Sequence, residues 1–471
     1  MKSNAAHSEI TVSYSFRGQT IHKKHFNKHL NCKARCTNKH NTMAKISEAF
    51  LHHAWKFNWL EKKPLSTHNG KPLEIIHPGI HNHHAGPDFL NARLRIDGTL
   101  WWGNVEIHIY GSDWNKHNHQ EDSNYKNVIL HVVLHNDTEI FHHTPGDLPI
   151  LDLSTCLNLS IWDAHQKWLN NYRWIPCESV IQQIDPILWH NASDRMLIER
   201  MEQRVTSIVA ALDSHGGDWS QIAFIELCKA FGFKSNSLPM EMLANSIPYT
   251  AIARHRSDPL QVEAMIFGQA GLLSGPSSDE YENRLAKEYV ILQQKYGLTP
   301  TEATIWNFGK VRPHNTPILR LAQLAGAVNK SEHLVSSLLY LDSTALLEWL
   351  RSETHPYWET NKHFGQKRSK HMDTILGIPS AQQLIINVAC RLRFAFGKHH
   401  NDMRMIDNAL SLMHSLTAEQ NSITQKWNIA GIQCEHAGDS QALIQLFSVY
   451  CTQERCFECP LGISLLQSSH P

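Results

Sequence analysis

The sequence predicts an α+β protein in which an N-terminal mixed-sheet α/β domain precedes a large all-α domain. Between residues 71 and 135, short apolar or alternating runs are separated by Gly, Pro, Asn and Asp, which is typical of strands. From about residue 159, apolar residues recur with the 3.6-residue spacing of helices, and strand patterns almost disappear. A chain of 471 residues is long enough for two or three domains. We therefore place an α/β domain at residues 44–158 and a helical domain at residues 159–471, with the boundary near YRWIPCESV.

The elements of the first domain follow in order from local patterns. MAKISEAFLHHAWKFNWL has the apolar spacing of one buried helix face. KPLEIIHPG, NARLRIDG, TLWWGNVEIHIY and KNVILHVVLHND are expected to be strands, and the IDGT turn is expected to join the second and third as a hairpin. NKHNHQEDSNY, before the fourth strand, has room for a short helix, while TEIFHHT and LPILDL are candidates for further strands.

Residues 1–42 form a basic segment without helical periodicity. They contain eight Lys and Arg residues against a single acid, Glu9, and we expect them to be a disordered extension. Met43, which opens the first helical pattern, is a candidate for the true start of translation; the alternative is that the extension is a targeting arm.

The bulk composition limits the class of protein only in part. Lys plus Arg and Asp plus Glu both number 44, so net charge neither indicates nor excludes a nucleic-acid partner. Apolar residues never run together over the 18 positions that a membrane span needs, so no membrane association is expected. The ten cysteines are irregularly spaced and no signal-peptide core is present, which favours reduced thiols and a cytoplasmic location.

Familiar catalytic and nucleotide-binding motifs are missing from the sequence. It contains no phosphate-binding loop, G-x-S-x-G or H-E-x-x-H. The glycines of FGQAGLL lie in an apolar helical pattern, so we expect them to permit close helix packing instead of phosphate binding.

Several segments resemble a known bacterial family. AGPDFLNARLRIDGTLWWGNVEIHI, SDWNKHNHQEDSNYKNVILHVV, RWIPC, VRPHNTPILRLAQLA and YCTQERCFECPLG are similar to sequences of the bacterial domain-of-unknown-function family 2851. The resemblance extends from about residue 44 to the end of the chain. It implies membership of that family and no particular activity.

The N-terminal domain also resembles the PD-(D/E)XK nuclease superfamily. That superfamily has a core of helix, three strands, helix and strand, with an aspartate near the second strand and a (D/E)xK motif on the third. Pro87 and Asp88 match the first element here, and Glu106, Ile107 and His108 match the second, with histidine in place of lysine. The resemblance implies a nuclease-like α/β domain that acts on nucleic acid.

Asp88 and Glu106 are the candidate metal ligands of such a site. Hydrolysis of a phosphodiester needs carboxylates that hold a hard divalent ion, so Mg²⁺ or Mn²⁺ is the expected cofactor. Glu106 and His108 are two apart on a strand and project to one face, where His108 would position or activate the water, with Glu74 as a further acid. The structural alternative is a solvated sheet face. The functional alternative is a catalytically inactive module that binds nucleic acid or a protein partner.

The segment after the third strand supplies further candidates. His117, His119 and Tyr125 would cap the face that carries Glu106 and could contact the phosphates of nucleic acid or hold a second ion. A histidine-rich loop on the surface is the simpler explanation of the same pattern.

The C-terminal segment YCTQERCFECPLG holds Cys451, Cys456 and Cys459 in a C-x4-C-x2-C arrangement, whose last pair has the spacing of metal-binding thiolates. Cys177, at the start of the helical half, is the first choice for a fourth ligand, while Cys434 and His436 are closer in sequence. Either zinc or a [4Fe-4S] cluster would satisfy four thiolates. The alternative is that these are ordinary reduced cysteines.

Overall fold

The fold is known from a computed structural model. It describes residues 46–61, 63–82, 84–137, 148–273, 276–309 and 313–468, and the backbone of two short strands, β1 (Ser15–Phe16) and β2 (Gln19–Thr20), which pair antiparallel. Apart from those two strands, the predicted disordered extension and the candidate start at Met43 lie outside the described residues. So does the expected strand at residues 138–144.

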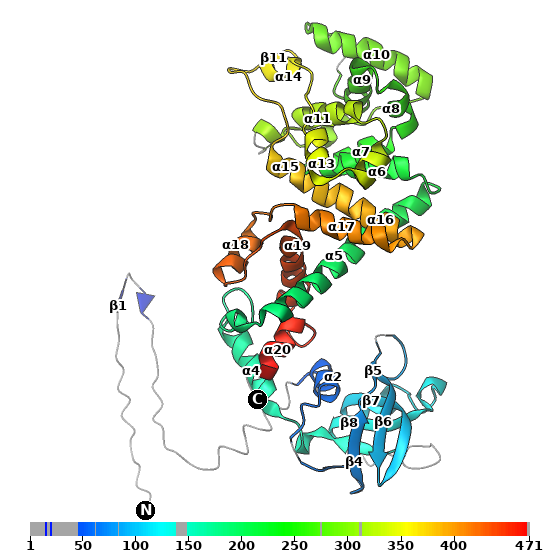
Figure 1. Cartoon of the computed structure of the whole chain (residues 1–471), viewed down its shortest axis with the longest axis vertical. Helices are drawn as coiled ribbons and strands as arrows, with labels where there is room; N and C mark the ends of the chain where they lie inside the picture. The colour runs from blue at the N-terminus through cyan, green and yellow to red at the C-terminus, as the bar shows by residue number, and fades with distance from the viewer. Residues whose placement is uncertain are drawn as a thin grey trace, which may run out of the picture. The chain divides into compact units, whose positions relative to one another are not determined.

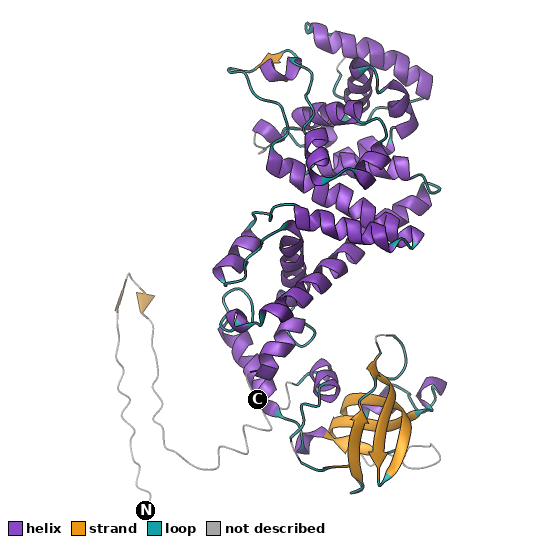
Figure 2. Cartoon of the chain, viewed as in Figure 1, coloured by secondary structure: helices purple, strands orange, loops and turns teal. Residues whose placement is uncertain are grey.

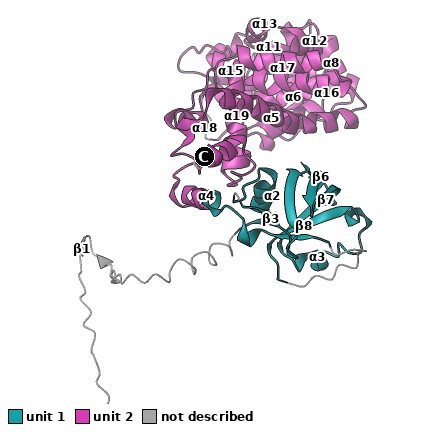
Figure 3. Cartoon of the chain, turned by 60° about the horizontal axis from the view of Figure 1, so that its bottom comes forward, with its two compact units in different colours: residues 1–162 teal, residues 163–471 magenta. Residues whose placement is uncertain are grey.

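The chain divides into two compact units, Met1–Trp162 and Asp163–Pro471 (Figure 3). We call them unit 1 and unit 2. The division falls four residues after the predicted boundary, inside helix α4 (Leu159–Asn171). Figure 2 shows that the large sheet belongs to unit 1 and that unit 2 is mainly helical.

Unit 1 contains helix α2, which precedes a mixed sheet (Figure 1). Its elements are α2 (Glu48–Lys56), β3 (Leu65–Ser66), β4 (Pro72–His77), β5 (Ile80–His81), β6 (Phe89–Ile96), β7 (Thr99–Tyr110), α3 (Asp113–Lys116), the 3₁₀ turn η1 (Ser123–Tyr125), β8 (Val128–His135), β9 (Ile150–Asp152) and the 3₁₀ turn η2 (Leu153–Thr155). The strand order is β3-β4-β6-β7-β8-β9, with β5 also paired to β6. β7, β8 and β9 run parallel and the other pairs are antiparallel, which confirms the predicted mixed sheet.

Helix α2 forms where its pattern predicts. The Ser47 side chain accepts a hydrogen bond from the Phe50 amide and so caps the first turn. Phe50, Leu51 and Trp55 are completely buried, and the Trp55 indole donates to the Pro78 carbonyl at 2.9 Å. The apolar face of α2 is therefore part of the core of unit 1.

The IDGT turn joins β6 and β7 as predicted. Asp97 and Gly98 both have positive φ, 53° and 79°, as a two-residue type I′ hairpin turn requires. At the other end of the hairpin, β6 contains a bulge: Ala92 pairs with Gly103, whereas Phe89 pairs with Val105, so that β6 has one extra residue between the two pairs. Asn91, within the bulge, has a φ of 57°.

Unit 2 is built from helices and one small hairpin. Its elements after α4 are η3 (Ile181–Gln183), α5 (Pro186–Ser214), α6 (Trp219–Phe231), α7 (Ser237–Asn245), α8 (Tyr249–His255), α9 (Pro259–Gln269), α10 (Glu280–Tyr296), η4 (Ala303–Ile305), η5 (Pro313–Asn315), α11 (Pro317–Lys330), α12 (Leu334–Tyr340), α13 (Ser343–Leu350), α14 (Tyr357–Thr360), β10 (Asn361–His363), β11 (Gln366–Lys367), α15 (Ile378–Leu384), the π-helical η6 (Ile385–Cys390), α16 (Arg391–His400), α17 (Met403–Ser415), α18 (Ser422–Ile429), α19 (Ala437–Gln445), the π-helical η7 (Leu446–Cys451) and α20 (Pro460–Ser468).

The prediction that unit 2 is all-helical is wrong at one place. β10 and β11 pair antiparallel around Gly365, whose φ is 65°. These strands are too short to show an alternating pattern in the sequence. No helix in the described ranges is both long and apolar enough to cross a membrane.

Close packing of α9 against α10 explains Gly268. A Cβ atom at this position would overlap the ring of Tyr289, whose hydroxyl donates to Gln269 Oε1 at 2.8 Å. The predicted packing role of this glycine is therefore confirmed.

We expect Gly268→Ala to lower the free energy of unfolding of unit 2 by about 1–3 kcal/mol, because the added methyl overpacks the contact between the two helices. Urea denaturation followed by circular dichroism measures this. Gly309→Ala is the control, since its added Cβ would meet only Asn307 Oδ1 at an ordinary 3.6 Å. Equal stability of the two variants would contradict the packing argument.

Candidate metal centre

Strand β7 places the two residues of the predicted motif on the face opposite Ile107. The Ile107 side chain is fully buried in the core of unit 1. Glu106 and His108 point to the other face, yet they too are buried, with only 5% and 2% of their surface exposed. The alternative of a solvated sheet face is therefore wrong, because the segment after β7 covers these residues.

Asp88 lies directly beside Glu106. The Asp88 amide donates to Glu106 Oε2 at 3.1 Å, and Asp88 Oδ2 accepts from the Ile107 amide at 2.9 Å. The same oxygen lies 3.3 Å from His52 Nε2. The structure thus brings together the two predicted carboxylates, and it adds a histidine from α2.

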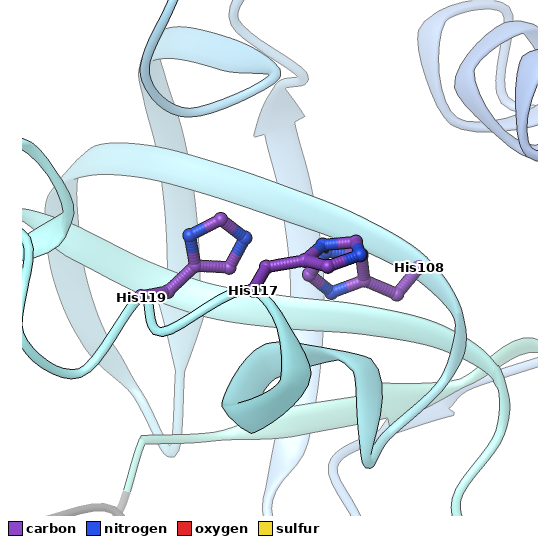
Figure 4. A group of neighbouring side chains, drawn as sticks. All are labelled: His108, His117 and His119. Carbon is purple, nitrogen blue, oxygen red and sulfur yellow. The ribbon is translucent and has the colours of Figure 1, made fainter.

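Three histidines converge on Glu106. His108 comes from β7, while His117 and His119 come from the turn after α3, and Figure 4 shows the three side chains grouped beside the strand. One nitrogen from each ring lies within 4.8 Å of the other two. Glu106 Oε1 is 3.5 Å from His108 Nε2 and 3.4 Å from His119 Nε2, and His117 Nδ1 is 3.2 Å from His108 Nε2. We call Glu106, His108, His117 and His119 the histidine–glutamate cluster.

These distances match the edges of a small coordination polyhedron. Zn–N bonds of about 2.0–2.1 Å in a tetrahedral site put neighbouring ligand atoms about 3.3 Å apart. The His117–His108, His119–Glu106 and His108–Glu106 separations, 3.2, 3.4 and 3.5 Å, bracket that value. His119 Nε2 is buried and has no hydrogen-bond partner despite its closeness to Glu106, as expected of a nitrogen oriented toward an ion.

A further histidine orients His108. His131 of β8 is fully buried, and its Nε2 lies 2.9 Å from His108 Nδ1. In the parallel register His131 is the partner of Glu106, so both side chains lie on the same face. A contact of this kind at Nδ1 leaves Nε2 of His108 facing the cluster, which is how metal-binding histidines are usually held.

The electrostatics of the cluster favour a cation. Burial, and then the neighbouring charge of Asp88, raises the pKa of Glu106 well above its usual range. Burial, and then His119 and His117, lowers the pKa of His108 to about 4. The chain therefore holds a buried carboxyl group next to neutral imidazoles, and a metal ion would supply the positive charge that stabilises the carboxylate.

Two site residues on α2 were missed by the sequence analysis. Glu48 and His52 are one helical turn apart and face Asp88; burial raises the pKa of Glu48, His52 lowers it and Asp88 raises it. An acid and a histidine at i and i+4 lie on one helix face, and this pattern is visible in the sequence. It does not indicate which side chains of the sheet the face would contact.

Of the other two predicted site residues, Tyr125 lies at the cluster and Glu74 does not. The Tyr125 ring stacks on His119 at 3.9 Å between centroids, and burial, followed by Glu106 and Asp88, raises its pKa to about 12. Glu74 is exposed on β4 and pairs with Arg95 at 2.7 Å. Arg95 is six residues along β6 from Phe89, about 20 Å at the rise of a strand, so Glu74 is not part of this site.

An exposed aromatic surface lies on the same face of the sheet. Trp102 precedes Glu106 by four residues on β7, and its side chain is 62% exposed. The Arg93 guanidinium lies over the Trp102 ring, 5.2 Å from its centroid. Alternation along the strand places Trp102 on the face of Glu106 and Trp101 on the opposite face.

Comparison with known proteins gives a family. Residues 48–422 match the family model described as protein of unknown function, DUF2851. The chain belongs to the DUF2851 family. The predicted membership is confirmed over about four-fifths of the chain, from α2 to the start of α18, and the match ends before Cys451. No curated protein and no solved structure matches this DUF2851 protein.

Proposed function

We propose that unit 1 of this DUF2851 protein is a metal-dependent phosphodiesterase that cleaves nucleic acid. The proposal rests on the histidine–glutamate cluster, in which one carboxylate oxygen and three ring nitrogens are spaced like the ligands of a single ion. The order of helix, three strands, covering segment and parallel strand agrees with the nuclease resemblance of the sequence.

The ligand set favours zinc over Mg²⁺. Imidazole nitrogens suit zinc and similar transition metals, whereas Mg²⁺ prefers oxygen ligands and keeps several waters. The sequence-based expectation of Mg²⁺ or Mn²⁺ rested on Asp88 and Glu106 alone. With His108, His117 and His119 beside Glu106, three of the four ligand atoms are nitrogens, so we assign the site to zinc.

Each residue of the site then has a distinct role. A bound divalent ion lowers the pKa of water and offsets negative charge on a phosphate. Asp88 accepts from the Ile107 amide and donates its own amide to Glu106, so it positions the Glu106 ligand. Asp88, whose side chain is 23% exposed, also lies against His52, and this pair can accept the proton of the attacking water.

The exposed Trp102–Arg93 stack suggests how a substrate strand would be held. Bases stack on exposed aromatic rings regardless of their sequence, and an arginine alongside contacts phosphate. Four residues of strand place Trp102 about 13 Å from Glu106, a separation that a single strand of a few nucleotides can span. We therefore propose single-stranded nucleic acid as the substrate.

A second function is favoured by one residue. His108 stands where the nuclease resemblance expects lysine, which is a fixed cation, and a chain without that charge could bind nucleic acid without cutting it. In that case the cluster would hold an ion that stabilises the fold of unit 1.

Stripping the purified full-length chain of metal with a chelator, and restoring one ion at a time, distinguishes these functions. We expect one zinc ion to bind per chain and to restore cleavage of a labelled single-stranded oligonucleotide, with Mg²⁺ much less effective. Zinc binding without cleavage of single-stranded or duplex DNA or RNA would favour the second function, in which the chain binds nucleic acid without cutting it. No zinc binding would rule out the assignment of the cluster.

We expect Trp102→Ala to raise KM for a single-stranded substrate by about 5-fold to 150-fold and to leave kcat nearly unchanged, since stacking contributes about 1–3 kcal/mol per base. Steady-state cleavage kinetics measure both constants. Trp101→Ala is the matched control, because that side chain is 46% exposed on the opposite face. An equal effect of the two substitutions would contradict the proposed substrate path.

A further inference from the structure

Four buried cysteines of unit 2 come from two distant parts of the chain. Cys177 follows α4, Cys451 ends η7, and Cys456 and Cys459 lie in the turn before α20. Each is between 7% and 8% exposed. The histidine–glutamate cluster of unit 1 involves none of them.

Three contacts just before Cys177 in sequence join its segment to the C-terminal one. The Tyr172 hydroxyl donates to Glu454 Oε1 at 2.9 Å, between Cys451 and Cys456 in sequence. The ring of His165 packs on Phe457 with centroids 4.3 Å apart. Trp174 stacks on Phe447 at 5.2 Å. The segment of residues 165–174, which ends three residues before Cys177, is therefore held against residues 447–457.

The four thiols lie within electrostatic reach of one another. Burial raises the pKa of Cys177 to about 12, with a further contribution from Cys459. Burial also raises the pKa of Cys451, with contributions from Cys459, Cys177 and Cys456. Four mutually repelling thiolates in an apolar environment are unfavourable unless a cationic group lies between them.

The other two candidates for the fourth ligand lie elsewhere. Burial and then the neighbouring Asp439 raise the pKa of Cys434 to about 11, partly offset by a hydrogen bond with Ser440. His436 caps α19, where its Nδ1 accepts from the Asp439 amide at 3.2 Å. Of the three predicted alternatives, the structure brings Cys177 to the triplet.

The spacing of the sulfur atoms shows whether the site fits a single zinc ion or a larger metal cluster. Tetrahedral zinc with Zn–S bonds of about 2.3 Å requires sulfurs about 3.8 Å apart. In the described part of the chain, one group of three possible ligand atoms lies within 4.8 Å of one another, and this group is the histidine trio of unit 1. The four cysteines do not form such a group. No three of the four sulfurs therefore all lie within 4.8 Å of one another, which is a wider spacing than a zinc ion needs.

The backbone of the turn that carries the last two cysteines lets Cys451, Cys456 and Cys459 lie close together. Glu454 has a φ of 55°, which lets the chain reverse between Cys451 and Cys456. A Cβ on Gly462 would overlap the carbonyl oxygen of Cys456, and the Gly462 amide donates to Cys459 Sγ at 3.4 Å. An N–H···S bond of this kind is one of the contacts that set the potential of an iron–sulfur cluster.

We propose that Cys177, Cys451, Cys456 and Cys459 bind a [4Fe-4S] cluster. The inorganic cubane occupies the space between sulfurs that are too far apart for a single zinc ion, and its irons take one thiolate each. The cluster fastens residues 446–468 to the segment that follows α4, so it contributes to the folding of unit 2.

Metal analysis of the full-length chain tests the proposal. Protein purified without oxygen is expected to contain about four iron and four inorganic sulfide per chain and to absorb broadly in the visible. Cys177→Ser and Cys456→Ser are expected to lose iron, sulfide and colour and to become sensitive to proteases in the C-terminal 30 or so residues. Cys434→Ala, the matched control from the same region, is expected to keep all three.

Other outcomes would overturn the cluster. Wild-type protein with zinc and no sulfide, or with neither metal after anaerobic reconstitution with iron and sulfide, would contradict it directly and does not depend on how any variant folds. Loss of iron in Cys434→Ala equal to that in Cys177→Ser would contradict the assignment of Cys177. Zinc bound by the histidine–glutamate cluster is distinguished because Glu106→Gln removes that zinc and leaves iron and sulfide unchanged.

Discussion

Glu106→Gln is expected to reduce zinc-dependent cleavage of nucleic acid by at least about 100-fold, because groups that merely support metal ligands already contribute 10–100-fold in affinity or activity. Glutamine preserves the shape of the side chain and one oxygen that can accept from the Asp88 amide. It lacks the charge that makes a carboxylate a ligand. The melting temperature of the metal-free chain is expected to change little, because the substitution also removes a buried ionisable group.

Zinc content, cleavage rate and thermal unfolding of the same preparations measure these effects. Glu74→Gln is the control: its carboxylate is exposed and pairs with Arg95 far along the sheet, so we expect activity and stability to remain within error. A fully active Glu106→Gln enzyme would refute the ligand role. A large fall in its melting temperature would make Glu106 a structural residue.

Trp358→Ala is expected to lower the stability of unit 2 by about 3–5 kcal/mol, as removal of a large buried ring does. Trp358 is fully buried, stacks on Phe267 at 5.1 Å and packs against Phe364 at the same distance. Its indole also donates to Glu263 Oε1. Burial raises the pKa of Glu263 to about 7, the Trp358 hydrogen bond lowers it, and the alanine variant would leave that acid without this partner.

Chemical denaturation followed by far-ultraviolet circular dichroism measures the loss. Ile429→Ala, at a side chain that is 83% exposed, is the control and is expected to change stability by less than about 0.5 kcal/mol. Zinc binding by unit 1 is expected to persist in Trp358→Ala, because unit 1 is a compact unit of its own. Loss of zinc binding together with unit 2 would show that the two units fold as one.

Local patterns were sufficient to predict the elements that surround the site. The hairpin of β6 and β7 follows from two turn residues, and the common face of Glu106 and His108 follows from strand alternation. The position of Asp88 beside Glu106 was predicted only from the nuclease resemblance. The two residues are 18 apart in sequence, and no local pattern predicts that they meet.

The rest of the site depends on long-range pairing. His131 reaches His108 only because β8 runs parallel to β7 in a register that places it opposite Glu106. His117 and His119 were expected to contact the phosphates of nucleic acid or to hold a second ion. The sequence could not show that their turn folds back over a buried carboxylate. The burial of Glu106 is likewise a tertiary property that an alternating strand pattern does not reveal.

The bulge in β6 makes the site depend on the register of the backbone as well as on side-chain chemistry. From Ala92 to Ile96 the hairpin keeps one register, and the extra residue at the bulge shifts the pairing by one before the strand reaches Phe89. If the first register continued past Ala92 without a bulge, Asp88 would be opposite Ile107 instead of Glu106, and its carboxylate would turn toward the apolar core. A relative that lacked one residue between Phe89 and Ala92 would pair regularly and keep Asp88 opposite Glu106, whereas a relative with the same number of residues and no bulge would retain every acid and histidine of the site and still be unable to assemble it.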